Sequence, residues 1–276
     1  MFLSLKNILI VINILLAISV LSDELSPNIT SPTTTEIKSL MLVGNSFFYY
    51  NNSLHNYLGK IIDNDPEISN IKRRSITING SSLSWHDIDA YLSNPNMGNF
   101  KIDTTKDNSY IEHENTSIDA VIIMDCSLCP IHPKTKDSFH EYVEIHSNTI
   151  RNNDAEPILF MSWGYKNKPE MYKKLKKEFL KAANNNNLLL VPVGEAFHLM
   201  NKLYPEINLY TSDNRHPSKE GTFLAANVVF ATLLGRKTEG NRGIAEINPT
   251  VAKKIQKIAD KTVSEFFKIQ LKQNHD

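Results

Sequence analysis

The sequence predicts a three-layer α/β/α domain with a mainly parallel, five-stranded sheet. Two observations lead to this fold class. Short apolar segments alternate with longer amphipathic ones from residue 38 onward, and most of the short segments are apolar on both faces. Strands that are apolar on both faces are typical of a parallel sheet with helices on each side. The alternation favours right-handed crossovers within one such sheet.

The predicted elements follow one another in a regular order. Strands are expected at 39–43, 75–78, 120–124, 158–161 and 188–193. Helices are expected at 53–64, 83–93, 137–152, 169–186, 195–203, 218–234 and 250–270, where apolar residues recur at helical spacing. The polar stretch 94–118 is the longest predicted loop. No repeat or second core interrupts the pattern, so one domain over 37–272 is the simplest interpretation.

The first residues differ from the rest of the chain. Lys6 precedes a run of apolar character from Ile8 to Leu21, and polar sequence follows Ser22. This order is typical of a secretory signal peptide over 1–22, because a membrane-spanning helix needs about 18 to 20 apolar residues. The alternative is an uncleaved segment that anchors the protein in a membrane. We therefore expect a secreted or otherwise exported protein, without stable membrane insertion after signal removal, and a disordered lead-in over 23–36.

Charge and composition argue against some classes of function. The 276 residues include 30 basic and 30 acidic side chains, so the formal net charge is zero. Such a chain lacks the positive field that concentrates nucleic acid, and we expect no nucleic-acid partner. Its length and its apolar content of 41 % are sufficient for one substantial core. The composition specifies no oligomeric state.

Only two cysteines occur, Cys126 and Cys129, in the sequence CSLC. A four-ligand zinc site needs more donors than these two thiols and the nearby His132, so we expect no metal and no other cofactor. A local disulfide and two inert thiols both remain open. In either case the core must supply most of the stability.

Ser46 lies where the first predicted strand ends, in the sequence GNSF at 44–47. Ligands collect at the carboxyl ends of parallel strands, because helix N-termini and loop amides converge there. We therefore expect the hydroxyl of Ser46 to be exposed near free backbone N–H groups. The alternative is that Ser46 or Asn45 only caps the next helix.

A second segment supplies the groups that can activate a serine. Asp213 and His216 are three residues apart in YTSDNRHPSKEG at 210–221. At this spacing a carboxylate can orient the imidazole through Nδ1–H while Nε2 acts as a general base. Together with Ser46, these residues are the parts of a Ser-His-Asp relay.

These segments resemble the signature blocks of the SGNH (GDSL-like) hydrolases, in particular the branch whose nucleophile motif reads GNSF. GNSF at 44–47 is similar to the first block and DNRHPSKEG at 213–221 to the last. Between them, NGSSLSWH at 79–86 resembles the second block and VIIMDCSLCP at 121–130 stands in place of the third. ILFMSWG at 158–164 resembles a strand and a tryptophan of the same branch. The resemblance spans nearly the whole chain after the signal peptide.

The resemblance implies a flavodoxin-like sandwich and a serine ester hydrolase. It assigns Ser46 as the nucleophile, His216 as the base and Asp213 as the carboxylate that orients the base. The N–H groups of Ser46 and Gly80 would form the oxyanion hole, for which a glycine permits close approach. The expected substrate is a small-molecule or glycan ester, acetyl esters included, and a lipid ester or a thioester is the alternative.

The third block departs from the family pattern. Relatives usually offer an Asn or Gln amide there as a further oxyanion donor, whereas this chain has Met124, Asp125, Cys126 and Ser127. Losing one such donor typically costs about a hundred- to a thousandfold in rate, unless Ser127, a thiol or Asn45 substitutes. The departure also leaves open a catalytically weak or inactive protein that binds a glycan or a protein partner.

Four residues are candidates for substrate binding: Asn45, His86, Ser127 and Trp163. All four lie in or beside the segments that resemble the family's blocks. For His86 at a helix start and Trp163 at a strand end, simple packing accounts for the residue equally well.

Overall fold

Five parallel strands form the central sheet of the computed structural model, which describes residues 25–69, 71–94, 96–97, 101–111 and 117–273. The strands are β1 (Ser39–Gly44), β2 (Lys72–Thr77), β5 (Ala120–Ile123), β6 (Glu156–Phe160) and β7 (Leu189–Val191). Their spatial order is β2-β1-β5-β6-β7, and every neighbouring pair is parallel. This is the flavodoxin-like order, in which the direction of connection reverses between β1 and β5. The predicted fold class is confirmed.

Successive side chains of each strand pack on opposite faces of the sheet. In β1, Leu40 and Leu42 belong to one core cluster, whereas Met41 and Val43 belong to the other. The same alternation continues through β5, β6 and β7. The sheet therefore has an apolar layer on each side, which explains why its strands are apolar throughout.

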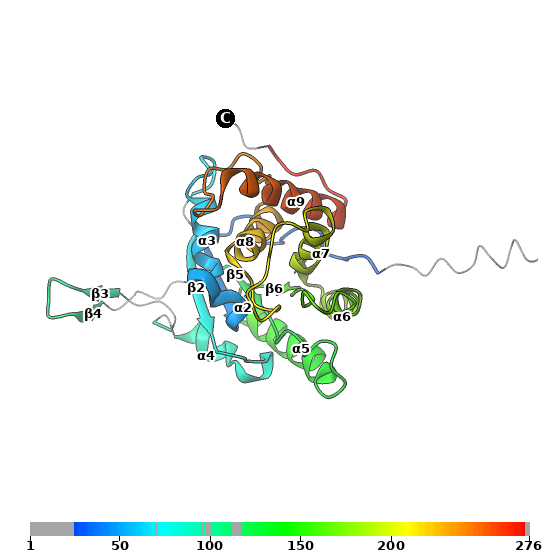
Figure 1. Cartoon of the computed structure of the whole chain (residues 1–276). Helices are drawn as coiled ribbons and strands as arrows, with labels where there is room; N and C mark the ends of the chain where they lie inside the picture. The colour runs from blue at the N-terminus through cyan, green and yellow to red at the C-terminus, as the bar shows by residue number, and fades with distance from the viewer. Residues whose placement is uncertain (1–24, 70, 95, 98–100, 112–116, 274–276) are drawn as a thin grey trace, which may run out of the picture.

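Helices cover both faces of this sheet (Figure 1). The first core cluster includes residues of α3 (Leu54–Ile62), α7 (Val193–Leu203), α8 (Lys219–Leu234) and α9 (Pro249–Phe267). The second includes residues of α4 (Ile88–Ser93), α5 (Lys136–Asn152) and α6 (Met171–Asn185). α8 is buried around its whole circumference because α3, α7 and α9 pack against it, and its sequence is accordingly apolar on all sides.

Several short elements differ from the predicted ones. A helix of one turn, α2 (Ser46–Tyr49), follows β1 and leads into the 3-10 turn η1 (Tyr50–Asn52). The predicted helix 83–93 is divided into the 3-10 turn η2 (Leu83–Trp85) and α4. Within the predicted loop 94–118, β3 (Lys101–Asp103) and β4 (Ser109–Ile111) pair as an antiparallel hairpin. Each of these elements is too short for hydrophobic periodicity to reveal it.

Residues 25–36 differ from the disordered lead-in that their composition predicts. The backbone N–H groups of Thr33 and Thr34 donate hydrogen bonds of 2.9 and 2.8 Å to the two carboxylate oxygens of Glu156. Nearer the N-terminus, the N–H of Asn28 donates to the side-chain oxygen of Asn184 at 2.9 Å. A segment with no apolar core of its own is thus held by acceptors that the folded domain provides.

The predicted signal peptide, 1–22, lies outside the described residues. Within the described part of the chain, no helix is long and apolar enough to cross a membrane. The division of the chain at residue 22 stays a prediction.

Replacing Glu156 with alanine is expected to release the segment 25–36 from the domain. Hydrogen bonds to a charged group contribute about 1.5 to 3 kcal/mol each, and the variant loses two of them. Proteinase K should then cleave within 25–36 at least about ten times faster than in the wild type, as followed by mass spectrometry. Glu144→Ala, on the exposed face of α5, is the control. Equal cleavage rates in all three proteins would show that Glu156 does not hold the segment.

Candidate active site

The first turn of α2 places Ser46 at the carboxyl edge of the sheet, where the residue is only 6 % exposed and thus more enclosed than the sequence predicts. Asn45 caps this turn, since its side-chain oxygen accepts a hydrogen bond of 3.2 Å from the N–H of Phe47. Gly44 is required by close packing, because a Cβ at this position would lie 2.9 Å from the ring of Phe48. The sequence GNSF therefore directs the chain sharply from β1 into a short helix that begins with Ser46.

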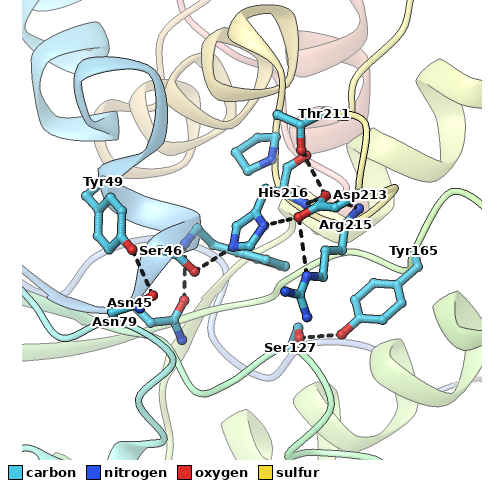
Figure 2. Close-up of polar contacts among 12 residues, drawn as sticks. Asn45, Ser46, Tyr49, Asn79, Ser127, Tyr165, Thr211, Asp213, Arg215 and His216 are labelled. Atoms are coloured by element: carbon cyan, nitrogen blue, oxygen red, sulfur yellow. Dashed lines mark hydrogen bonds and ion pairs between the residues drawn. The ribbon is translucent and has the colours of Figure 1, made fainter.

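The structure brings Ser46, His216 and Asp213 together, although they come from opposite ends of the domain (Figure 2). Nε2 of His216 lies 2.8 Å from Oγ of Ser46, and Nδ1 of His216 is hydrogen-bonded to Oδ2 of Asp213. Because an ionised carboxylate can only accept, Nδ1 carries the proton and Nε2 accepts from the serine hydroxyl. This is the arrangement in which an imidazole can remove a proton from a serine.

Asp213 is held as a carboxylate by several donors. Its Oδ1 accepts hydrogen bonds from the hydroxyl of Thr211 at 2.8 Å and from the N–H groups of Arg215 and His216 at 2.9 and 3.0 Å. Burial raises the pKa of Asp213, but these bonds and the one from the imidazole outweigh it and hold the pKa well below its usual range. The carboxylate therefore remains charged and keeps the imidazole of His216 in one orientation.

Aromatic rings enclose the imidazole of His216. Tyr50 stacks on it at a centroid distance of 4.1 Å, and Phe47 meets it edge-on at 5.5 Å. Trp163 stacks in turn on Phe47 at 4.5 Å. Sequence reasoning missed Tyr50 and Phe47; the aromatic run FFYY directly after Ser46 is the signal that could have indicated them.

No protein-family model matches the chain, and a search of curated proteins finds no significant match. Solved structures do match. A DUF4886 family protein from Bacteroides uniformis ATCC 8492 is 20 % identical with a TM-score of 0.57, over 86 % of this chain and 98 % of that one. A candidate SGNH hydrolase from Slackia heliotrinireducens is 19 % identical with a TM-score of 0.52, over 71 % and 99 %. A member of the lipolytic protein G-D-S-L family from Veillonella parvula DSM 2008 is 9 % identical with a TM-score of 0.50, over 71 % and 98 %.

The chain has the SGNH hydrolase fold. The segment 79–86, which resembles the family's second block, begins in the loop after β2. Gly80 lies in that loop with φ +68°, a conformation that favours glycine. The hydroxyl of Ser81 donates to the carbonyl of Gly44 at 3.2 Å, so the loop is fixed against the segment that precedes Ser46.

The segment 121–130, which stands in place of the family's third block, contains no amide side chain. Asp125 is buried and turns away, because its Oδ1 accepts from the N–H groups of Leu83 and Cys126. Cys126 and Cys129 form a disulfide, so neither offers a thiol or a thiolate ligand. The hydroxyl of Ser127 is 2.7 Å from that of Tyr165. Of the predicted substitutes for the missing donor, the thiol is therefore excluded.

Three of the four predicted substrate-binding residues are buried. The amide nitrogen of Asn45 donates to the carbonyls of Ser81 and Asp125, at 3.0 and 3.2 Å, and is not free for an oxyanion. Trp163 is 1 % exposed, and its Nε1–H donates to the carbonyl of Arg215 at 2.9 Å. Both side chains make hydrogen bonds that position the loops around Ser46 and His216. Their part in substrate binding stays a prediction.

His86 is also buried, beneath the second block. Its Nε2 lies 2.9 Å from the hydroxyl of Ser81 and its Nδ1 lies 3.3 Å from that of Tyr91. Since the Ser81 hydroxyl donates to Gly44, Nε2 of His86 carries the proton and donates to Ser81. Burial, together with the nearby His146, lowers the pKa of His86 to about 4, so the ring is neutral at physiological pH.

The stability that His86 provides is expected to disappear in mild acid. The unfolded chain binds a proton at this histidine near pH 6.5, whereas the folded chain does so only near 4. The difference in unfolding free energy between wild type and His86→Gln should therefore shrink as the pH falls from about 7 to about 4.5, as measured by urea unfolding. Burial raises the pKa of Asp125 to about 6, which acts in the opposite direction but cancels because both proteins contain it. A difference that is independent of pH would contradict this account of His86.

Proposed function

We propose that this protein is an exported serine esterase, which hydrolyses carboxylic esters, acetyl esters among them, of a carbohydrate or another small alcohol. The observation that carries the proposal is the pair of contacts from His216 to Ser46 and Asp213. A serine hydroxyl is a weak nucleophile by itself, and an adjacent oriented base makes it reactive. The SGNH fold, in which solved relatives are described as hydrolases and lipolytic proteins, supports the same chemistry.

In the proposed reaction, Oγ of Ser46 attacks the ester carbonyl while Nε2 of His216 takes the hydroxyl proton. The tetrahedral intermediate collapses as His216 returns that proton to the departing alcohol, which leaves an acyl group on Ser46. A water molecule, deprotonated by His216, then attacks the acyl-enzyme, and the carboxylic acid leaves as Ser46 regains its proton. Asp213 stays ionised throughout and stabilises the imidazolium.

The proposed oxyanion hole consists of the N–H groups of Ser46 and Gly80. Ser46 is the first residue of α2, and the first N–H of a helix has no intrahelical acceptor. The positive φ of Gly80 supports its part in the hole, because the turn needs a residue without a Cβ. With no amide from the third block, we expect slower hydrolysis than in enzymes that have three donors.

Export is supported by two features. The stretch from Ile8 to Leu21 has the pattern of a signal peptide. The Cys126–Cys129 disulfide fits an oxidising compartment, where such bonds persist.

The proposed function is tested with p-nitrophenyl acetate, butyrate and long-chain esters, together with a fluorophosphonate probe. We expect turnover of the short esters and covalent labelling of Ser46, located by peptide mass spectrometry. Preference for the long-chain esters would indicate a lipid esterase instead. A properly folded protein that neither turns over an ester nor reacts with the probe would favour a binding protein and overturn the proposal.

A further inference from the structure

Arg215 lies beside the proposed catalytic residues in a fixed position. Its N–H donates to Oδ1 of Asp213 at 2.9 Å, and its carbonyl accepts the Nε1–H of Trp163 at the same distance. The backbone of Arg215 is thus held on both sides. Its side chain extends from this loop toward Ser127 (Figure 2).

The guanidinium of Arg215 is only lightly engaged by the protein. Its Nε lies 3.3 Å from Oδ2 of Asp213, and the side chain is 52 % exposed. Asp213 does not depend on this contact, because it also accepts from Thr211, from His216 and from two backbone N–H groups. The two terminal nitrogens have no hydrogen-bond partner within the described part of the chain. They form the planar fork that binds a carboxylate or a phosphate with two parallel bonds.

Two hydroxyl groups lie on the side toward which Arg215 points. Ser127, in the loop after β5, and Tyr165, in the loop after β6, are hydrogen-bonded to each other, and both are half-buried. Only one of the two protons can be used in that bond, so the pair keeps one O–H to donate. Asp125, the acid closest in sequence to Ser127, turns away toward Leu83 and Cys126. Figure 2 shows the guanidinium of Arg215 and these hydroxyl groups on the same side of Ser46.

We propose that Arg215, Ser127 and Tyr165 form a subsite that binds an anionic group of the substrate, so that the preferred esters carry a carboxylate or a comparable anion near the ester bond. This inference rests on the proposed function and adds a substrate class to it. Ser127 retains its predicted part in substrate binding, with the anion as its ligand. The alternative is that Arg215 acts only through Asp213, in which case it would affect every ester alike.

Two pairs of esters separate these two roles of Arg215. para-Acetoxybenzoate and its methyl ester differ in a carboxylate on the alcohol half, and mono-p-nitrophenyl glutarate and its methyl ester differ in one on the acyl half. We expect the wild type to prefer the anionic member of at least one pair by about tenfold or more in kcat/KM. In Arg215→Gln the ratio should fall to about one, through a higher KM for the anionic ester, and Arg215→Lys should be intermediate. Added salt should lower kcat/KM only for the anionic esters.

The control is Lys166→Gln, which removes a positive charge at the residue after Tyr165, in the loop after β6. Its Nζ contacts Asn208 instead of the subsite, so this variant should keep the wild-type preference. If the wild type preferred the anionic ester in neither pair, the proposed subsite would be overturned. Equal losses for both members of a pair in Arg215→Gln, with kcat falling and KM unchanged, would overturn it as well.

Binding to the Ser46→Ala variant, measured by calorimetry, tests the subsite independently of turnover. In at least one of the two pairs, the anionic ester should bind about tenfold or more tightly than its methyl ester, and adding Arg215→Gln should remove the difference. If the wild type hydrolysed no ester, the proposed function would fail while this measurement still decided the subsite. Equal affinities for both esters would overturn it.

Discussion

Replacing Ser46 with alanine is expected to lower kcat/KM for p-nitrophenyl acetate by about 10⁴-fold or more. Removing a serine nucleophile from a Ser-His-Asp relay leaves only the contribution of substrate binding and of the oxyanion hole. The change removes one oxygen at the start of α2, where Asn45 continues to cap the helix. We therefore expect circular dichroism and the urea midpoint to match those of the wild type.

The matched control for Ser46 is Ser84→Ala. Ser84 is exposed in the 3-10 turn η2, and among the described residues its side chain bonds only the hydroxyl of Ser82. This variant should hydrolyse the ester at the wild-type rate. Retention of more than about a tenth of the activity by a folded Ser46→Ala would reject Ser46 as the nucleophile.

Asp213→Asn is expected to lower kcat by about 10⁴-fold while the fold stays intact. The amide oxygen can still accept from the N–H groups of Arg215 and His216, so the turn is kept. The amide nitrogen then faces Nδ1 of His216 and donates to it, which moves the imidazole proton to Nε2. A protonated Nε2 cannot take the proton of Ser46.

The control for Asp213 is Asp154→Asn, an equally small change at an exposed turn with φ +58°, a conformation that asparagine tolerates. Its kcat should be that of the wild type. The position of the imidazole proton in each protein can be measured by ¹⁵N NMR of the histidine rings. If the Asp213 variant retained kcat within about tenfold of wild type, the carboxylate would not set the tautomer.

Much of the fold could be predicted because the apolar sequences of the strands indicate that both faces of the sheet are buried. Val121, Ile122 and Ile123 are all fully buried, and a short, unbroken apolar run of this kind is typical of a strand that is covered on both faces. The position of α2 could not be predicted, since one helical turn gives no periodicity. The ordered segment 25–36 could not be predicted either, because its acceptors come from Glu156 and Asn184, which are more than a hundred residues away in sequence.

The candidate site, too, could be predicted only in part. Ser46, Asp213 and His216 could be proposed because their order and spacing match a known pattern. The burial of Trp163 and His86 could not be foreseen, since aromatic side chains at loop positions contact substrate or core equally well. The direction of the Arg215 side chain depends on Trp163 and Asp213, which fix its backbone, and no local sequence signal reports such contacts.

The hydrogen bond between Ser46 and His216 joins residues that are 170 positions apart. Synthesis proceeds from the N-terminus, and contacts between distant residues form late because a long loop must close first. Ser46 is therefore synthesised well before His216, the base that would activate it. A nascent chain that already contains β1, β5 and β6 still lacks the imidazole, so the reactive hydroxyl appears only when the loop before α8 reaches β1. The proposed activity therefore requires a chain that already contains residues 213–216 and has folded far enough to bring them to β1.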